Sequence, residues 1–176
     1  PTSGANLDLA LDWSGQRVVA AWWAKQGFEI GWAPLGATRE DQWRRTTLPG
    51  PGASGHRGHQ LIANSTGAVG LLTYTGPLSE SSLQFRWVGP TGPGTAMPIL
   101  RPGTDTEAAR FKSIGFENMA FAIDPEGVAH IAILAEKRGE VPAGIKRLFY
   151  ATVTGGATAG GGPEVGGHGT TEMERE

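Results

Sequence analysis

The amino-acid sequence predicts an all-β protein built from about three repeats of one antiparallel sheet. An Asp/Asn-x-x-Gly pattern occurs at 12–15, 64–67 and 124–127, each time between two apolar runs. An Asp or Asn side chain at the first position bonds its own backbone, and Gly at the fourth accepts a positive φ. Each repeat is therefore expected to open with a β-hairpin. The expected turn residues are Asp12, Gly15, Asn64, Gly67, Asp124 and Gly127.

The apolar runs give four strands in each of the first two repeats and three in the last. In the first repeat we expect strands near 7–12, 17–23, 28–34 and 43–48. In the second we expect them near 59–64, 68–74, 83–88 and 96–100, and in the third near 118–124, 128–135 and 145–153. Two of these runs, 18–23 and 128–134, are apolar nearly throughout. Such strands are covered on both faces, so the sheets are expected to stack on one another.

The last repeat is predicted to lack its fourth strand. After Val153 the chain becomes a Gly-rich segment, 155–163, with too little apolar surface to order itself. We therefore divide the chain into a repeat region, 1–154, and a flexible tail, 155–176. The repeats run approximately over 4–50, 55–100 and 115–154.

The repeats resemble those of bacterial β-propeller proteins with sialidase-like blades. In that family a Gly, an apolar strand, an Asp-x-x-Gly turn, a second apolar strand and a Tyr-Ala strand recur, often closing with a Trp. The third repeat matches best, through 114–132 and Phe149-Tyr150-Ala151, and the first follows, through 7–33 and Trp43. The second repeat departs from the pattern because Asn64 replaces Asp. The resemblance implies about three propeller blades, and propellers carry many different functions.

Three blades do not close a propeller, which has four to eight. Each face of a blade needs an apolar neighbour. Leaving an apolar face of about 300 Å² exposed to water loses several kcal/mol of burial free energy, at about 25 cal/mol/Å². We therefore expect another copy or another chain to complete the ring. A solitary β-sandwich is the alternative architecture.

Composition excludes several classes of function. The 176 residues carry a formal charge of −2, so charge alone does not attract the chain to nucleic acid. No cysteine is present, which excludes disulfides and thiol catalysis. No run of eighteen apolar residues predicts insertion into a membrane. We expect an extracellular, periplasmic or cell-surface location, although any leader would lie outside a sequence that begins at Pro1.

Two clusters are candidate binding residues. Trp43 stands beside Arg44 and Arg45 near a strand end, where an aromatic ring and two cations suit a sugar or an acidic group. A solvated strand end with a core Trp is the competing interpretation. His56 and His59 have an H-x-x-H spacing, but metal sites need three or four ligands. A solvated pair is favoured for them, and no metal site is predicted.

No cofactor or catalytic residue is predicted. The Gly pattern at 50–55 lacks the following helix that a dinucleotide site requires. We expect a non-catalytic binding or scaffold module with a glycan as a further candidate partner. The alternative is a fragment of a sialidase-like glycan-processing enzyme, which would need Arg and carboxylate side chains to converge on one pocket.

Overall fold

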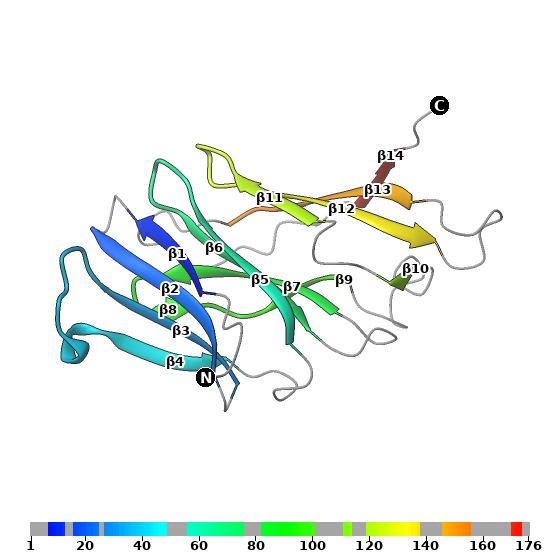
Figure 1. Cartoon of the computed structure of the whole chain (residues 1–176). Helices are drawn as coiled ribbons and strands as arrows, with labels where there is room; N and C mark the ends of the chain where they lie inside the picture. Colours follow the sequence, from blue (N-terminus) through cyan, green and yellow to red (C-terminus); the bar gives the residue numbers. More distant parts are fainter. Residues whose placement is uncertain are drawn as a thin grey trace.

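The chain folds into three antiparallel sheets, shown one after another in Figure 1. The computed structural model describes residues 7–12, 16–24, 27–48, 56–75, 82–100, 111–113, 119–137, 146–155 and 170–173. No α-helix occurs in these ranges, so the prediction of an all-β fold is confirmed. Sheet 1 has the order β1 (Leu7–Asp12), β2 (Arg17–Ala24), β3 (Gly27–Pro34) and β4 (Arg44–Leu48), and a 3-10 turn, Glu40–Gln42, precedes β4.

Sheets 2 and 3 repeat this meander with additions. Sheet 2 contains β5 (His56–Ala63), β6 (Val69–Thr75) and β7 (Ser82–Gly89), and β7 also pairs with β8 (Gly92–Pro93) and β9 (Met97–Leu100). Sheet 3 contains β11 (Met119–Ile123), β12 (Ala129–Lys137), β13 (Lys146–Val153) and β14 (Thr170–Met173), and β10 (Phe111–Ser113) pairs with the end of β12. All eleven strands predicted from the sequence are present within a few residues of their expected bounds.

The prediction that the third repeat lacks a fourth strand is wrong. β14 pairs with β13 from Leu148↔Met173 to Ala151↔Thr170, within the segment assigned to the tail. The physical reason is that β13 would otherwise present an unpaired edge, and an edge attracts any segment able to pair with it. Thr170 and Thr171 are β-branched and suit a strand.

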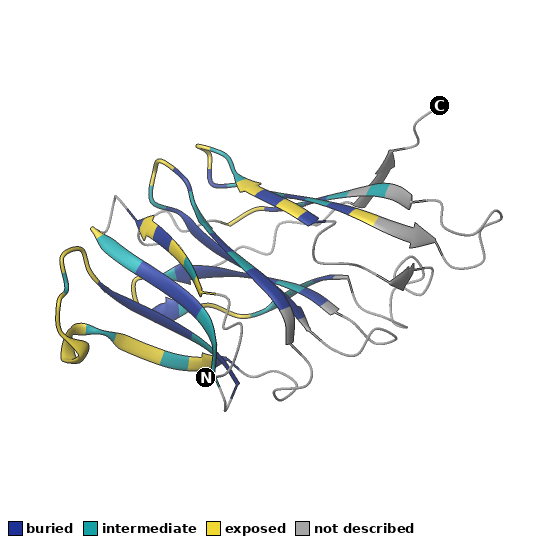
Figure 2. Cartoon of the chain, viewed as in Figure 1, coloured by how far each residue is buried: buried dark blue, intermediate teal, exposed yellow. Residues whose placement is uncertain are grey.

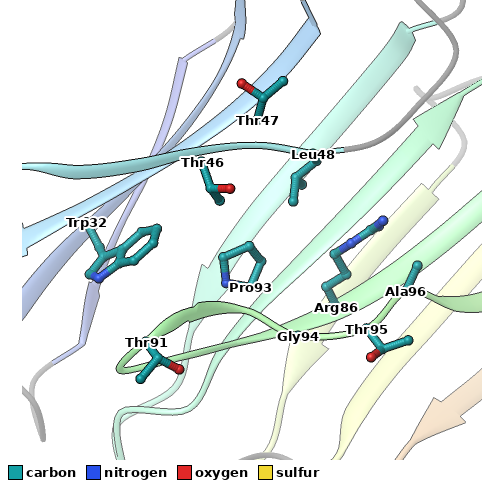
Figure 3. A pocket seen from close by; sticks show the side chains of 10 residues that line it. All are labelled: Trp32, Thr46, Thr47, Leu48, Arg86, Thr91, Pro93, Gly94, Thr95 and Ala96. Atoms are coloured by element: carbon teal, nitrogen blue, oxygen red, sulfur yellow. The ribbon is translucent and has the colours of Figure 1, made fainter.

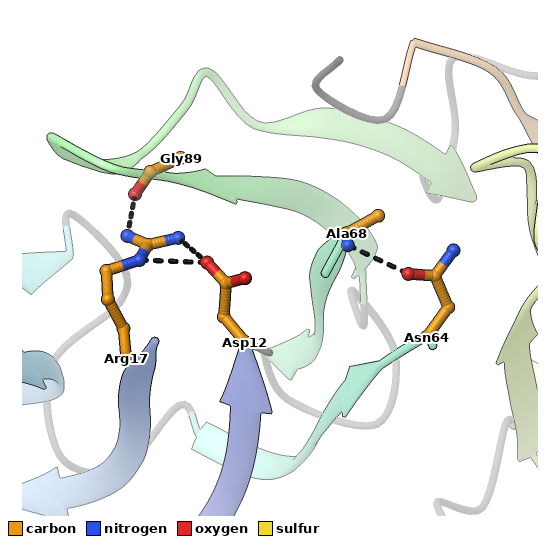
Figure 4. Close-up of polar contacts among 5 residues, drawn as sticks. All are labelled: Asp12, Arg17, Asn64, Ala68 and Gly89. Atoms are coloured by element: carbon orange, nitrogen blue, oxygen red, sulfur yellow. Dashed lines mark hydrogen bonds and ion pairs between the residues drawn. The ribbon is translucent and has the colours of Figure 1, made fainter. Parts of the chain in front are cut away.

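Two of the predicted turns form as expected. The Asn64 side-chain oxygen accepts the N–H groups of Thr66 and Ala68 at 3.1 and 2.8 Å, the second of which is drawn in Figure 4. The Asp124 carboxylate accepts the N–H of Val128 at 2.7 Å. The glycines that close the two turns, Gly67 and Gly127, have φ of 90° and 81°. These contacts confirm that the side chain bonds its own turn while Gly supplies the positive φ.

The acid of the first repeat forms a contact between sheets. Asp12 lies in β1 opposite Arg17, and the two side chains form a largely buried ion pair (Figure 4). Arg17 also donates from Nη1 to the carbonyl oxygen of Gly89 in β7 at 2.8 Å. Asp12 therefore helps to join sheet 1 to sheet 2. Gly15 lies outside the described residues.

Sheet 2 packs between the other two sheets. One buried apolar cluster joins sheet 1 to sheet 2, and its members are Ala10, Val19, Ala21, Phe28, Ile30, Trp32, Leu48, Leu61, Val69, Leu71 and Val88. A second cluster joins sheet 2 to sheet 3. Its larger members are Leu72, Tyr74, Leu83, Phe85, Trp87, Ile99, Met119, Phe121, Ile131, Ile133 and Val153. Sheet 2 is therefore covered on both faces. The two runs for which such cover is predicted, 18–23 in β2 and 128–134 in β12, lie instead in the two outer sheets.

Strand β6 shows how the two clusters divide. Leu71 belongs to the cluster with sheet 1 and Leu72 to the cluster with sheet 3, and neither is exposed at all. Successive side chains of a strand point to opposite faces, so β6 and β7 are buried on both sides, as the dark colour of β6 in Figure 2 shows. Gly70 allows the close approach of sheet 3, because a Cβ there would lie 2.8 Å from Phe85 and 3.0 Å from Phe121.

Candidate functional site

The outer face of sheet 1 is an exposed apolar surface. Leu7, Leu9 and Leu11 are 58, 61 and 39% exposed. They stand opposite Trp22, Ala20 and Val18 on β2, and directly opposite residues of an antiparallel pair share a face. We call these six residues the leucine face; its leucines are exposed, Val18 and Trp22 are half-buried, and Ala20 is buried beneath them. A single exposed leucine is ordinary, whereas a contiguous apolar surface indicates an interaction site.

Trp43 extends the leucine face across the sheet. A Cβ at Gly31 would lie 2.9 Å from the Trp22 ring and 3.2 Å from the Trp43 ring, so both rings rest against this glycine. Arg45 stands opposite Gly31 and is ion-paired with Glu40 at 2.8 Å. Two of the predicted binding residues, Trp43 and Arg45, therefore lie on or beside this face.

The outer face of sheet 3 is also open. It carries Leu134, which is 40% exposed, together with Ala120, Ala122, His130, Ala132 and Tyr150. We call these six residues the alanine face. His130 links two neighbours there: its Nε2 lies 2.8 Å from Asp124 Oδ2, and its Nδ1 bonds the Tyr150 hydroxyl. The hydrogen bond from His130 is the main cause that holds the pKa of Asp124 below its usual value, and the Val128 N–H adds to it.

The leucine face is equivalent to two faces that are already covered inside the chain. Leu9, Leu61 and Phe121 each stand three residues before the first residue of the repeated turn. Leu61 packs against sheet 1 and Phe121 against sheet 2, and each is 7% exposed. Leu9 has no preceding sheet in the described chain and is 61% exposed. Each sheet thus offers one face to the sheet before it, and in sheet 1 that face is free.

A pocket of ≈ 620 Å³ lies between β3 and β4 of sheet 1 and the segment from β7 to β9 of sheet 2. Figure 3 shows side chains of β4 across from the segment that contains β8 and its flanking turns. The lining residues are Trp32, Thr46, Thr47, Leu48, Arg86, Thr91, Pro93, Gly94, Thr95 and Ala96. The lining is therefore rich in hydroxyl groups and has one aromatic ring and one cation.

Arg86 is the buried cation of this pocket. It projects from β7 toward sheet 1 and is only 6% exposed. Its Nη1 donates to Gln84 Oε1 at 3.2 Å, which is a neutral acceptor. Burial lowers the pKa of Arg86 from its ordinary value. Arg44 stands opposite Trp32 on the same face of sheet 1, so the predicted residue Arg44 adds positive charge near the pocket.

The interpretation of His56 and His59 as a solvated pair is wrong for His59, because β5 places this side chain in the interior. His59 is 3% exposed between sheets 1 and 2, and its Nε2–H donates to the Ala21 carbonyl oxygen at 3.1 Å. Its ring meets Phe28 edge-on at 4.7 Å. Burial is the main cause that lowers the pKa of His59, against the opposing effect of Asp8. His56 lies in β5, and its side chain is outside the described residues.

Comparison of the chain with models of protein families, with curated proteins and with solved structures finds no match. Within the described ranges, no group of three or more His, Asp or Glu side chains is arranged to hold a metal ion. The same ranges contain no helix long and apolar enough to cross a membrane.

Sequence reasoning missed Arg86 and the leucine face. Arg86 alternates with Phe85 and Trp87, a pattern that is typical of a strand with one wet face. The burial of Arg86 comes from the packing of sheet 1 on the polar side of β7, which the sequence of β7 does not reveal. The leucines at 7, 9 and 11 alternate with Asp8 and Asp12, and this pattern indicates a buried leucine side.

Proposed function

We propose that this protein is a non-catalytic binding or scaffold module whose three sheets are blades of a β-propeller. Another copy or another chain completes the ring. The observation that carries the proposal is the leucine face, which is apolar and exposed although its equivalents in sheets 2 and 3 are buried. A surface built like two internal interfaces is suited to a third contact of the same kind.

The internal packing favours a second copy as the completing partner. The stack already joins the far face of one sheet to the near face of the next, first between sheets 1 and 2 and again between sheets 2 and 3. One near face, the leucine face, and one far face, the alanine face, remain uncovered. Two copies joined in the same way form six sheets, and two such head-to-tail contacts close the ring when the rotation per sheet permits it.

No observation favours the alternative of a glycan-processing enzyme. Glycosidases of the common type place two carboxylates on opposite sides of the bond that they cleave. The pocket at Arg86 has no Asp or Glu among its lining residues in the described part of the chain. The hydrogen-bonded group of Asp124, His130 and Tyr150 supplies a single carboxylate on an open face.

The mass of the purified chain in solution tests the proposal. Sedimentation analysis is expected to give a multiple of 18.4 kDa if a second copy completes the ring. If another chain does so, the isolated protein sediments as a monomer that binds a hydrophobic dye through its open faces. A monomer that binds no such dye refutes the proposal.

Leu9→Glu is the variant for this experiment, because it places a charge in the centre of the leucine face. It is expected to reduce the assembled fraction, or dye binding by the monomer. Leu35→Glu is the matched control, since Leu35 is similarly exposed, at 49%, but lies in the turn that follows β3. Equal effects of the two substitutions would contradict a specific role of the leucine face.

A further inference from the structure

Among the described residues, the pocket between sheets 1 and 2 holds a buried positive charge and has no acidic residue in its lining. Arg86 is 6% exposed, and Gln84 is its hydrogen-bond partner in the described chain. A guanidinium carries five N–H donors and stays charged in proteins. Burying such a group without an anion is costly, and buried charges in proteins are normally paired. Within the described part of the chain, the charge of Arg86 therefore has no anionic partner.

The surroundings of Arg86 suit an anionic ligand better than an internal partner. None of the residues that line the pocket is acidic, and four of them are threonines. Threonine hydroxyls donate and accept hydrogen bonds. Arg44 stands on the same face of sheet 1 as Trp32, and it adds a second positive charge near the pocket. Nothing on the described lining competes with an incoming anion.

We propose that this pocket binds a small ligand through a carboxylate group. The planar guanidinium fork of Arg86 matches a carboxylate with two parallel hydrogen bonds. The volume of ≈ 620 Å³ lies within the range of small-molecule sites and has room for a sugar-sized body beside the carboxylate. Trp32 contributes apolar surface to the pocket wall, and the threonines offer hydrogen bonds to hydroxyl groups of that body.

The inference does not depend on the proposed assembly. The pocket is formed by the inner faces of sheets 1 and 2, whereas assembly uses the outer faces of sheets 1 and 3. A protein that binds an acid and sediments as a dye-free monomer would refute the assembly alone. A protein that assembles but binds neither acid would refute only the proposed carboxylate site.

Titration calorimetry with D-glucuronate and D-galacturonate tests the carboxylate site, with D-glucose and D-galactose as neutral counterparts. At least one acid is expected to bind saturably, with at least tenfold higher affinity than its neutral sugar. Arg86→Met removes the charge at similar volume and is expected to weaken that binding at least tenfold. Arg45→Gln is the control, because Arg45 lies on the opposite face and pairs with Glu40; its affinity is expected to stay within twofold.

Two further measurements keep the test decisive. Without ligand, Arg86→Met is expected to unfold at the same temperature as the wild type or higher, since it removes an unpaired buried charge. In the unsubstituted protein, the Nε–H resonance of Arg86 is expected to shift on addition of the acid that binds. Absence of binding by both acids, equal binding of an acid and its neutral sugar, or full affinity in Arg86→Met overturns the proposal.

Discussion

Three equivalent side chains allow the stacking of the sheets to be measured directly. Leu9, Leu61 and Phe121 occupy the same place in sheets 1, 2 and 3, and their exposed fractions are 61, 7 and 7%. Truncation of each to Ala removes the same part of each sheet's near face. Buried leucine and phenylalanine truncations cost about 2–5 and 3–5 kcal/mol, respectively. We expect Leu61→Ala and Phe121→Ala to lower the free energy of unfolding by these amounts.

Leu9→Ala separates a free chain from an assembled one. In a free chain Leu9 is largely in water, and surface substitutions usually change stability by no more than about 0.5 kcal/mol. When another sheet covers the leucine face, the exposed parts of its three leucines are equivalent to about one and a half whole side chains. At about 1.5–3 kcal/mol for each buried side chain, that cover contributes roughly 2–5 kcal/mol. Under that cover Leu9 is itself a buried leucine, so Leu9→Ala is expected to lower the free energy of unfolding about as much as Leu61→Ala.

The assay is urea unfolding followed by tryptophan fluorescence at two protein concentrations. A shift in midpoint at constant slope reports stability, and a concentration-dependent midpoint reports association. A cost below about 1 kcal/mol for both Leu61→Ala and Phe121→Ala would refute the stacking of the sheets. A small cost for Leu9→Ala, together with a midpoint independent of concentration, would refute the covering of the leucine face by a second copy.

Three other substitutions test the interior. Gly70→Ala is expected to cost about 1–3 kcal/mol in urea unfolding, because its Cβ would meet the Phe85 ring at 2.8 Å; an unchanged midpoint would contradict this packing. Asn64→Asp is expected to be less stable than wild type but more stable than Asn64→Ala. Asp keeps the acceptor for the turn N–H groups and loses the bond from Nδ2 to the Asp124 carbonyl oxygen at 2.6 Å, and the reverse order would count against that bond. The lowered pKa of His59 means that the unfolded state binds more protons. Stability is therefore complete above the unfolded pKa of about 6.5 and declines as the pH falls through that value toward the folded pKa. His59→Gln is expected to reduce the fall in the free energy of unfolding between about pH 7 and 5, measured by urea unfolding at each pH. The same fall in the variant as in the wild type would refute this role.

Local patterns were sufficient to predict the strands and most turns. An Asn64 or Asp124 side chain followed three residues later by Gly has one favourable backbone solution, and the structure adopts it at both places. The fourth strand of sheet 3 is different. β14 reaches β13 across a Gly-rich segment, and pairing over that separation depends on the open edge of β13 rather than on a pattern within 170–173.

The binding residues were harder to predict because their environment comes from another sheet. Trp43, Arg44 and Arg45 are adjacent in sequence, yet the structure places Arg44 on the pocket side of sheet 1 and Arg45 on the leucine side. Alternation along a strand sends neighbours to opposite faces. Arg86 is the one cation among the described pocket residues, and it comes from the second repeat rather than the first. No other charged residue lies beside it in β7 to mark it in the sequence.

The first hairpin of sheet 1 has a loop one residue shorter than that of sheet 2, and this length decides which face of β2 each side chain takes. Four residues separate the last cross-strand pair of that hairpin, Asp12 and Arg17, whereas five separate Ala63 and Val69 in sheet 2. A shift of one residue exchanges the two faces of a strand. Val19 therefore faces sheet 2, although alignment of the turns equates it with Leu71, which faces sheet 1.

The composition of β2 makes this shift harmless. Its run from Val18 to Trp23 is apolar at every position, so either register gives one apolar side to sheet 2 and another to the outside. A strand with one polar side would have placed that side against the core or against the leucines of β1. Because β2 is apolar on both sides, the free face of sheet 1 stays apolar across two strands. That continuity is the property that a further sheet requires of the surface on which it packs.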